Sequence, residues 1–463
     1  MIRTEIILNS KLIKKIFNQA VKPFIEISTD TRTMKTGDAF VALAGESYDA
    51  FNFIEEVIGK GCTVFVYNHD EVRSKKTELL ARQYPDITFI GVVDTLQFLQ
   101  EISQVHVQNL KRNKLKHVIG ITGSNGKTTT KNILYHLLNA ILGEKLTCTQ
   151  GNLNNHVGVP LTLLKINEDH VTSIVEMGSN HPGEIASLCN LASPTAGIIT
   201  NIGKAHLEFL HSQAGVLEEK RCLFDSVMKN TKNEGLFIIN SDDEFLNTLP
   251  VYQNVITIGK TRKNIFFLKN GVEILLNNEK ISLQNHELTG IHNFYNLAVA
   301  FMIAWKLFPD EKSKLINAVS SFKPTSNRSV WIREENKLIF MDAYNANPSS
   351  MQAALEGFVD KCSKERVLKE NICFVLGDMN ELGASGPALH EEIGSFIKKL
   401  QGKNAIFVGR FAKNYQKGFG KSSQIYQDVG ELLKDWEKIK KKYEYFFIKG
   451  SRSLQLELLM DIT

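Results

Sequence analysis

The sequence has no long apolar run, and this absence excludes a protein that spans a membrane with helices. No stretch approaches the ~18 consecutive apolar residues that a membrane-spanning helix needs. The first six residues also lack the basic-then-apolar layout of a signal peptide. We therefore expect a cytoplasmic protein with no membrane partner.

Cysteine is scarce and scattered, which excludes a disulfide scaffold. No two of the six cysteines form a C-x-x-C pair; they are Cys62, Cys148, Cys189, Cys222, Cys362 and Cys373. This usage suits a reducing compartment. Proline is also infrequent, with 10 in 463 residues, and no repeat or low-complexity tract interrupts the chain.

A strong charge imbalance is missing as well. The net charge is only +5, with 55 basic and 50 acidic residues. The basic run at 438–442 is expected to be a solvated helix face, so we expect no nucleic-acid partner. A phosphorylated small molecule is the anionic ligand that this chain is expected to bind.

Length and composition indicate a globular protein of about three domains, at ~150 residues each. We predict a small α/β domain over 1–110 and a central P-loop domain with a mostly parallel sheet over 111–325. A Rossmann-like domain over 326–463 would follow. The boundaries are a polar run at 111–114 and a linker at 323–327.

Two features stand out in the first domain. Apolar spacing predicts an amphipathic helix from Ser10 to Asn18. A polar cluster then ends an apolar run, and it consists of Ser28, Asp30, Thr31 and Arg32. Arginine at a strand end suits a diphosphate, but a capped turn explains the same residues equally well.

The stretch from Gly120 to Thr130 is expected to bind nucleotide phosphates. It lies between an apolar strand and a helical pattern, where backbone N–H groups can surround phosphate oxygens. Lys127 would contact the β- and γ-phosphates, and the Thr128 hydroxyl would hold Mg²⁺. The other residues of the cradle are Gly123, Ser124, Asn125, Gly126 and Thr129. The strict P-loop pattern has glycine where Ile121 stands, so an ordinary glycine-rich turn remains the alternative.

Strand and helix patterns alternate through the rest of the chain, which predicts doubly wound parallel sheets. Central strands are expected at 117–122, 172–177, 196–201 and 235–240, and a hairpin region at 265–283. In the third domain, strands are expected at 338–343, 372–377, 404–409 and 443–449, and a last helix at 453–460. Ligands bind at the carboxyl ends of such strands, so Glu176 and Asn201 should point at the nucleotide.

Several segments together resemble the Mur ligases, ATP-dependent enzymes that build the peptide of peptidoglycan precursors. These segments are Gly120–Thr130, Glu176–His181, Ala205–Glu208 and Gly290–Asn293. Other segments resemble the members that add D-alanyl-D-alanine to UDP-N-acetylmuramoyl-tripeptide, the last step of that assembly. These are Gly151–Asn155, Asp342–Pro348, Leu376–Gly383 and Lys449–Arg452. The resemblance covers nearly the whole chain and implies an acyl-phosphate intermediate.

The resemblance also implies roles for individual residues. The implied catalytic residues are Lys127, Glu176, His206 and Lys220, and the implied metal ligands are Thr128, Glu176, His206 and a carbamylated Lys220. Further ATP contacts would come from Asn293, Asn296, Arg328 and Asp342. The UDP-sugar end of the substrate would be held by Ser28, Asp30, Thr31 and Arg32 of the first domain together with Asn152, Asn154 and Asn155. Tyr344 and Asn345 would also bind substrate.

Residue types alone support simpler interpretations of some of these positions. A single histidine such as His206 is more often a surface or core residue, and it is an unusual ligand for Mg²⁺. Lys220 would by default be a solvated charge on a helix face. Two positions depart from the family pattern: His156 replaces a usual acidic residue, and Arg221-Cys222 replaces Gly-Glu.

Two other functions compete with this interpretation. A folylpolyglutamate synthetase shares the architecture, but its P-loop typically continues Gly-Lys-Gly-Ser where this chain has Gly126-Lys127-Thr128-Thr129. A P-loop switch that hydrolyses nucleotide only to change shape would not need two further domains. We expect a monomer, and the sequence leaves open whether the tripeptide ends in diaminopimelate or lysine.

Overall fold

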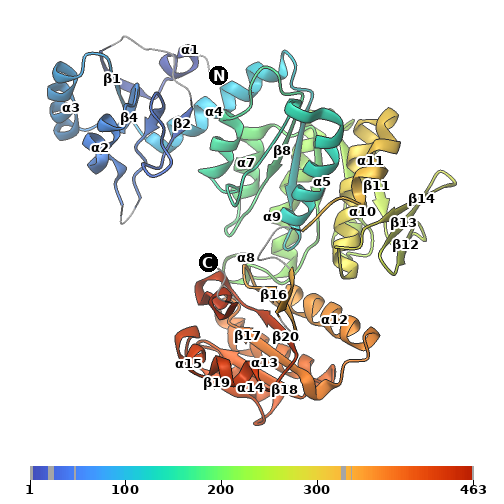
Figure 1. Cartoon of the computed structure of the whole chain (residues 1–463). Helices are drawn as coiled ribbons and strands as arrows, with labels where there is room; N and C mark the ends of the chain where they lie inside the picture. The colour runs from blue at the N-terminus through green and yellow to red at the C-terminus, as the bar shows by residue number, and fades with distance from the viewer. Residues whose placement is uncertain (1–3, 19–25, 46–47, 325–329, 335, 461–463) are drawn as a thin grey trace.

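The computed structural model describes residues 4–18, 26–45, 48–324, 330–334 and 336–460. The chain forms three lobes in sequence order, each built on a β-sheet with helices against it (Figure 1). This confirms the predicted three-domain α/β fold with mostly parallel sheets. The boundaries near 110 and 325 stay predictions, and the second falls on residues outside the described ranges. Within these ranges, no helix has the length and apolar character needed to cross a membrane.

The first domain has a five-stranded sheet in the order β1-β5-β4-β3-β2, parallel except for β1. Its strands are β1 (Ile13–Phe17), β2 (Ile27–Ser28), β3 (Ala39–Val41), β4 (Val64–Asn68) and β5 (Thr88–Val92). Its helices are α1 (Thr4–Leu8), α2 (Ile54–Gly59), α3 (Glu71–Gln83) and α4 (Thr95–Lys111).

The predicted helix from Ser10 to Asn18 is wrong. Strand β1 occupies most of this segment and pairs antiparallel with β5. Its register is interrupted between Ile13 and Lys15, so the apolar side chains fall three and four residues apart. A bulge of this kind makes a strand imitate the apolar spacing of a helix.

Helix α4 belongs to two hydrophobic cores. Phe98 and Ile102 pack in the core of the first sheet, whereas Val107 and Leu110 pack in a core of the central domain. The helix therefore joins the first lobe to the central lobe by shared packing rather than by a loop alone.

The central domain has a six-stranded parallel sheet in the order β11-β10-β9-β6-β8-β7. Its strands are β6 (His117–Thr122), β7 (Leu146–Cys148), β8 (Thr172–Glu176), β9 (Ala196–Ile199), β10 (Leu236–Asn240) and β11 (Val255–Ile258). Its helices are α5 (Lys127–Leu142), α6 (Gly158–Leu164), α7 (Glu184–Ala192), α8 (Leu207–Leu210), α9 (Gln213–Asn230), α10 (Ile291–Leu307) and α11 (Lys312–Val319).

The predicted hairpin region forms a separate antiparallel sheet of three strands. They are β12 (Ile265–Leu268), β13 (Gly271–Leu276) and β14 (Glu279–Gln284). The second turn is made by Asn277 and Asn278, both at positive φ, as two-residue hairpin turns require.

The C-terminal domain has a six-stranded sheet in the order β15-β16-β20-β17-β18-β19, in which β15 alone is antiparallel to its neighbour. Its strands are β15 (Val330–Glu334), β16 (Lys337–Asp342), β17 (Ile372–Gly377), β18 (Asn404–Val408), β19 (Gln424–Tyr426) and β20 (Tyr445–Lys449). Its helices are α12 (Pro348–Lys364), α13 (Gly386–Lys399), α14 (Ala412–Phe419) and α15 (Val429–Lys440). The expected last helix is instead two short 3₁₀ turns, Arg452–Leu454 and Leu456–Met460.

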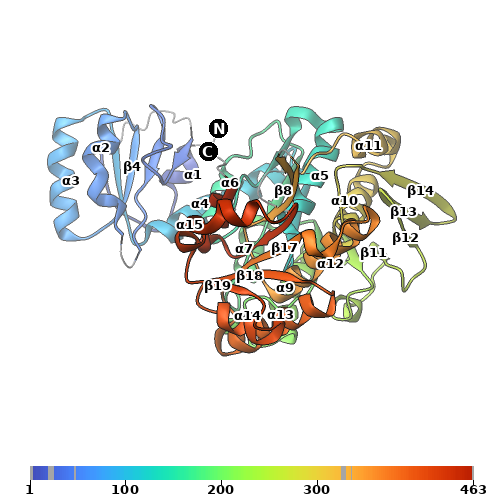
Figure 2. The same ribbon diagram turned by 60° about the horizontal axis from the view of Figure 1, so that its bottom comes forward.

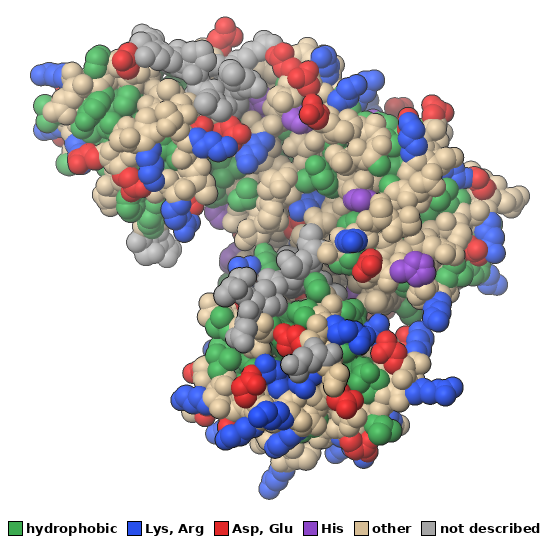
Figure 3. Space-filling model, in the orientation of Figure 1, with side chains coloured by type: hydrophobic (Ala, Val, Ile, Leu, Met, Phe, Trp, Pro, Cys, Tyr) green, Lys and Arg blue, Asp and Glu red, His purple; other side chains and the backbone are tan. Residues whose placement is uncertain are grey.

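The C-terminal domain lies against the central domain, as the rotated view makes clear (Figure 2). The space-filling view shows an open recess between the first and last lobes, with basic and acidic side chains interspersed around it (Figure 3). Residues that follow the carboxyl ends of the central and C-terminal strands line one shared pocket.

Candidate active site

The turn between β6 and α5 depends on two glycines. Gly126 has a φ of +80° and is the N-cap of α5. Gly123 has a φ of +142°, and a Cβ atom there would lie 1.9 Å from the Thr200 hydroxyl oxygen. Backbone conformation and space therefore both require glycine. The turn directs backbone N–H groups and the positive end of α5 to one place, an arrangement that binds phosphate oxygens.

The turn is held in shape by the segment that follows β9. Asn201 accepts two backbone N–H bonds, from Ser124 to its carbonyl oxygen (3.0 Å) and from Asn125 to its Oδ1 atom (3.1 Å). The Thr200 hydroxyl donates to the Asn125 carbonyl oxygen at 2.5 Å. The Ser124 hydroxyl accepts the Gly203 N–H at 2.8 Å. Asn201 also lines the pocket, as its position after a strand predicted.

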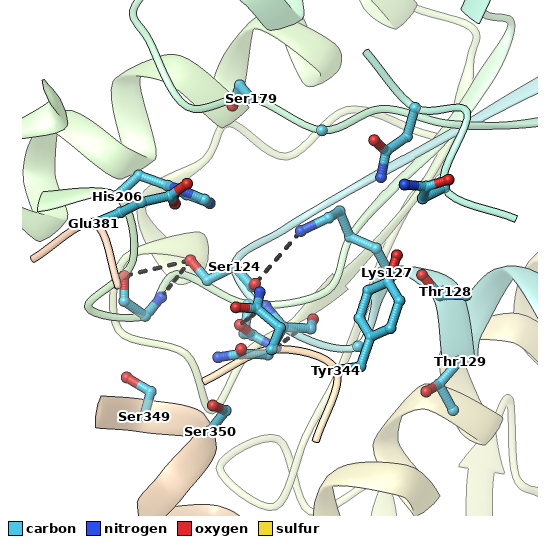
Figure 4. A pocket seen from close by; sticks show the side chains of 18 of the residues that line it. Ser124, Lys127, Thr128, Thr129, Ser179, His206, Tyr344, Ser349, Ser350 and Glu381 are labelled. Carbon is cyan, nitrogen blue, oxygen red and sulfur yellow. Dashed lines mark hydrogen bonds and ion pairs between the residues drawn. The ribbon is translucent and has the colours of Figure 1, made fainter. Parts of the chain in front are cut away.

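Lys127 lies in the first turn of α5, with its ammonium over the glycine turn. Its Nζ donates to the carbonyl oxygens of Gly123 (2.6 Å) and Ser124 (3.4 Å). The side chain is half-buried and extends toward the middle of the pocket (Figure 4). A positive charge therefore faces any phosphate that the turn holds.

Glu176 ends β8 with an almost fully buried carboxylate, 1% exposed. Its Oε1 atom accepts hydrogen bonds from the Thr128 hydroxyl (2.9 Å) and the Asn154 amide (2.8 Å). Among the described residues, none donates a hydrogen bond to its Oε2 atom. A buried carboxylate oxygen without a donor, beside a hydroxyl, fits a hard divalent cation. The same described residues contain no group of three or more carboxylate, imidazole or thiol side chains that could hold a metal by themselves.

Lys220 is fully buried in α9, so the interpretation as a solvated helix-face charge is wrong. Its Nζ donates to the Ser179 hydroxyl at 3.4 Å. Burial, reinforced by the charge of Lys127, lowers the pKa of Lys220 to about 7, although Glu219 and Glu184 act in the opposite direction. Lys220 does not line the pocket directly but lies behind Ser179, which does.

His206 forms a hydrogen bond to Glu381 across the two domains. Its Nδ1 atom lies 2.5 Å from the carboxylate of Glu381, which follows β17 in the C-terminal domain. Burial lowers the pKa of His206, and the contact with Glu381 partly offsets that effect. The same hydrogen bond lowers the pKa of Glu381. The two side chains lie together in the pocket (Figure 4), and their hydrogen bond uses the Nδ1 atom of the His206 ring.

The C-terminal wall of the pocket contains a buried ion pair. The Lys449 ammonium lies 2.6 Å from the Asp342 carboxylate and also donates to the Asn345 carbonyl oxygen at 2.8 Å. His292, from the first turn of α10, lies close enough to this pair to be affected by both charges, and burial lowers its pKa to about 4. The pair fixes Asp342 and Asn345 in one arrangement.

Two buried asparagines approach the glycine turn from α10. The Asn296 amide lies so close to Gly126 that a Cβ there would be 2.7 Å from its Oδ1 atom. Asn293 accepts a hydrogen bond from Asn296 and donates to the Thr289 carbonyl oxygen at 2.8 Å. Both therefore lie beside the turn, and part of the hydrogen-bonding capacity of their amides is used by contacts within the protein.

These groups surround one pocket of about 840 Å³ between the central and C-terminal domains. The predicted site residues that line it are Ser124, Asn125, Gly126, Lys127, Thr128, Thr129, Asn152, Asn154, Asn155, Glu176, His206, Asn293, Asn296, Asp342, Tyr344 and Asn345. Gly123 and Lys220 lie behind its walls. Arg328 is outside the described residues.

The first-domain cluster is not part of this pocket. Asp30 accepts the Arg32 backbone N–H at 2.9 Å and pairs with the Arg32 guanidinium at 2.7 Å. Ser28 donates its hydroxyl to the Asp30 carbonyl oxygen, and Thr31 accepts the Lys60 ammonium on its carbonyl oxygen. The local geometry is that of a capped turn, with the Arg32 side chain 86% exposed. A role in substrate binding stays a prediction.

Sequence reasoning missed several residues that line the pocket. They are Ser179, Asn180, His181, His292, Ser349, Ser350, Asn380, Glu381, Lys449, Ser451, Arg452 and Ser453. Many of them belong to motifs that were recognised. Ser179, Asn180 and His181 follow β8, Asn380 and Glu381 follow β17, and Ser451, Arg452 and Ser453 follow β20, so a position just after a strand was the signal for these eight.

Comparison with known proteins gives consistent matches along the chain. Residues 121–304 match the Mur ligase middle domain, and residues 327–452 match the Mur ligase glutamate ligase domain. The chain is 31% identical to UDP-N-acetylmuramoyl-tripeptide--D-alanyl-D-alanine ligase from Bacillus subtilis, over 93% of this chain and 91% of that protein. The enzyme of the same name from Escherichia coli is 30% identical, over 93% and 92%.

Solved structures agree with these matches. MurF from Acinetobacter baumannii superimposes with a TM-score of 0.76 at 26% identity and covers 96% of each chain. The MurF ligase from Thermotoga maritima in complex with ADP has the same fold, with a TM-score of 0.76 at 24% identity over 94% and 96% of the chains.

Proposed function

The chain belongs to the Mur ligase family, and we propose that it joins D-alanyl-D-alanine to UDP-N-acetylmuramoyl-tripeptide with ATP. Relatives that carry this activity in their names match more than nine-tenths of the chain at 30–31% identity. The product is the UDP-linked pentapeptide precursor of peptidoglycan. The folylpolyglutamate synthetase and nucleotide-switch interpretations are therefore set aside.

The observation that supports this function best is the pocket between the two domains. On one side is a phosphate cradle with Lys127, and on the other are polar residues after β16, β17 and β20. A ligase that must bring ATP to a carboxylate and then an amine to the same carbon needs such a shared site.

The proposed reaction has two steps. The tripeptide carboxylate attacks the γ-phosphorus of ATP, which releases ADP and forms an acyl phosphate. The dipeptide amine then attacks the carbonyl carbon, its nitrogen loses a proton, and the bond to phosphate breaks. Protein groups contribute mainly by positioning and by neutralising charge, so Lys127 stabilises the negative charge that develops on the transferred phosphoryl group.

Mg²⁺ is proposed to bind beside the cradle. Thr128 and Glu176 fit it, because the Glu176 Oε2 atom is buried without a described hydrogen-bond donor. His206 and a modified Lys220 would complete the protein ligands. When bound, the ion would offset the negative charge of the phosphates. Thr128 and Asn154 fix the Glu176 carboxylate from its other oxygen.

Lys220 is proposed to be carbamylated. Its Nζ atom would attack the carbon of CO₂ and lose a proton, which converts an amine into a carboxylate-like group. Burial supports this proposal, because an enclosed ammonium loses its hydration and is also repelled by the charge of Lys127. The Ser179 hydroxyl, 3.4 Å away, is available as a hydrogen-bond partner.

The remaining contacts are proposals from the family resemblance. The adenine would lie near Asn293 and Asn296, and Asp342 would contact ATP from the C-terminal domain. The UDP-sugar would bind between the first-domain cluster and Asn152, Asn154 and Asn155. The cytoplasmic location and the monomeric state stay predictions.

A ligation assay tests the function. Purified protein with ATP, Mg²⁺, UDP-muramoyl-tripeptide and D-Ala-D-Ala should form pentapeptide and ADP. The products are detected by mass spectrometry, with tripeptides ending in diaminopimelate or lysine.

Lys127→Ala should lower the ligation rate by about 10²–10³-fold, because the developing phosphoryl charge loses its cation. Lys131→Met, whose lysine donates to the Thr149 carbonyl oxygen outside the pocket, is the matched control and should keep most activity. Equal phosphate release without the dipeptide would instead favour a nucleotide switch.

A further inference from the structure

The C-terminal sheet has a topological switch point of its own. Strand β20 lies between β16 and β17, although it comes last in the chain. Helices α12, α13 and α14 pack on one face of this sheet, and α15 packs on the other. In open α/β sheets, ligands bind outside the carboxyl ends of the strands at such a point. The C-terminal domain is therefore expected to bind a ligand group of its own beside the phosphate cradle.

A polar cluster occupies this point, contributed by the segments after β16, β17 and β20. Asn380 donates its backbone N–H to the Ser451 hydroxyl at 3.1 Å and its amide to the Ser453 hydroxyl at 3.0 Å. Tyr344 and Arg452 complete the cluster, and all five residues line the pocket. These bonds hold the segment after β17 and the segment after β20 in a fixed arrangement.

Arg452 is the charged member of the cluster. Its guanidinium lies 5.2 Å from the centre of the Tyr344 ring and is exposed to the pocket. Among the described residues, no carboxylate forms an ion pair with it. The neighbouring Lys449, by contrast, is neutralised by Asp342. A guanidinium that is positioned by an aromatic ring and lacks a counter-ion suits the bidentate binding of a carboxylate.

The ligand follows from the chemistry of the proposed function, on which this inference rests. The phosphates of ATP have the cradle and Lys127, and the tripeptide carboxylate must react there. The terminal carboxylate of the incoming dipeptide does not react and needs an anchor that leaves its amine free. We propose that Arg452 binds this carboxylate and that Asn380 and Ser453 contact the dipeptide beside it. Arg452 is then a specificity-determining residue for the amine substrate.

A comparison of acid and amide substrates tests this assignment. The wild-type enzyme should use D-Ala-D-Ala at least about tenfold better, in kcat/KM, than the same dipeptide with a C-terminal carboxamide. Arg452→Gln should lower kcat/KM for the acid by a similar factor and leave the amide nearly unchanged. KM for ATP and for the UDP-tripeptide should stay within about twofold of wild type, because neither ligand loses a contact.

Arg410→Gln is the matched control. Arg410 also follows a strand of this sheet and stacks on an aromatic ring, 4.4 Å from the centre of Phe411, but it does not line the pocket. In Arg410→Gln, the ratio of kcat/KM for the acid dipeptide to kcat/KM for the carboxamide should equal the wild-type ratio. Suppose that the wild type ligates. If Arg452→Gln then keeps the wild-type ratio of acid to amide, or raises KM for ATP instead, the assignment of Arg452 is overturned and the proposed function is not. A wild type that forms no pentapeptide with any tripeptide would overturn the proposed function.

Discussion

Lys220 gives a test at the scale of a single residue. Its amine is enclosed in α9, and its pKa is lowered mainly by burial. Lys220→Met keeps the length of the side chain and removes the group that has to be desolvated. We expect this variant to be at least as stable as wild type in thermal unfolding but nearly inactive in ligation.

The chemical part of this prediction has its own measurement. Wild-type protein supplied with ¹³C-bicarbonate should show a carbamate signal in carbon NMR that is missing from Lys220→Met. Lys111→Met serves as the control, because Lys111 is also partly buried and donates to the Ser193 carbonyl oxygen away from the pocket. A near-normal ligation rate in Lys220→Met would contradict a role for this residue.

The burial of Lys220 could not be predicted from its neighbours. The local sequence places it between Glu219 and Arg221, as on many solvated helices. The structure turns Glu219 inward as well, where it accepts the backbone N–H groups of Gly183 (2.6 Å) and Ile185 (2.7 Å) at the start of α7. The packing of α7 and other elements against α9 makes this face internal. In contrast, the positions of Lys127 and Glu176 followed from strand ends, which are local signals.

At the scale of elements, His390 in α13 holds the segment that follows β17. Its Nδ1–H donates to the Gly386 carbonyl oxygen at 2.6 Å, and its Nε2 atom accepts the Met379 N–H at 2.9 Å. Only a neutral ring can do both. Burial lowers its pKa, and the charges of Asp378 and Arg410 act in opposite directions.

This arrangement predicts that acid destabilises the segment. Because the folded pKa of His390 lies below the ordinary value of 6.5, the unfolded state binds more protons as pH falls below 6.5. The free energy of local opening at 378–383 should therefore decrease below that pH, by at most about 1.4 kcal/mol per pH unit. Hydrogen–deuterium exchange, corrected for intrinsic rates, measures this loss.

His390→Gln should weaken the pH dependence, since an amide oxygen can accept the Met379 N–H without titrating. The same substitution at His106, a buried histidine of α4 that contacts the Ile166 carbonyl oxygen, should leave the slope at 378–383 unchanged. An unaltered slope in His390→Gln would show that another group causes the acid sensitivity.

Most elements of the central and C-terminal sheets were predictable, because buried parallel strands form short apolar runs between helical patterns. Strand β1 was not, since a bulge imitated helical spacing. Strand β19, Gln424–Tyr426, was also missed; it is an edge strand of three residues and is largely exposed. Short edge strands bury little apolar surface, so periodicity gives little evidence for them.

At the scale of the whole molecule, the central and C-terminal domains meet through polar contacts around the pocket. These include the pair of His206 with Glu381 and the hydrogen bond from the Lys204 N–H to the Ser349 hydroxyl at 3.1 Å. Polar interfaces of this kind permit rigid-body motion between domains. The order of the domains was predictable from motifs, but the residue pairs across the interface were not, because they depend on how two separate sheets are oriented.

Asn125 and Asn347 form a reciprocal amide pair across this interface. The Asn347 amide donates to Asn125 Oδ1 at 2.7 Å, and the Asn125 amide donates back at 3.3 Å. Asn347 is also the N-cap of α12 and accepts the Ser350 N–H at 2.9 Å. The pair therefore links the phosphate cradle directly to the start of a C-terminal helix. We expect it to favour the arrangement in which the central and C-terminal domains meet at the pocket, over one in which they have rotated apart.

Asn347→Ser separates the two roles, because serine can cap a helix but is too short to reach Asn125. We expect Asn347→Ser to lower the ligation rate several-fold with little change in thermal stability. We also expect nucleotide to make the wild-type protein more compact in small-angle X-ray scattering, and Asn347→Ser to become less compact than wild type under the same conditions. Asn347→Ala should lose about 1 kcal/mol of stability in addition. In a double-mutant cycle, adding Asn125→Ala to Asn347→Ser should cost less than Asn125→Ala alone, because both changes break the same contact. Strictly additive effects on kcat/KM would mean that the two amides act independently and that closure depends on the other contacts.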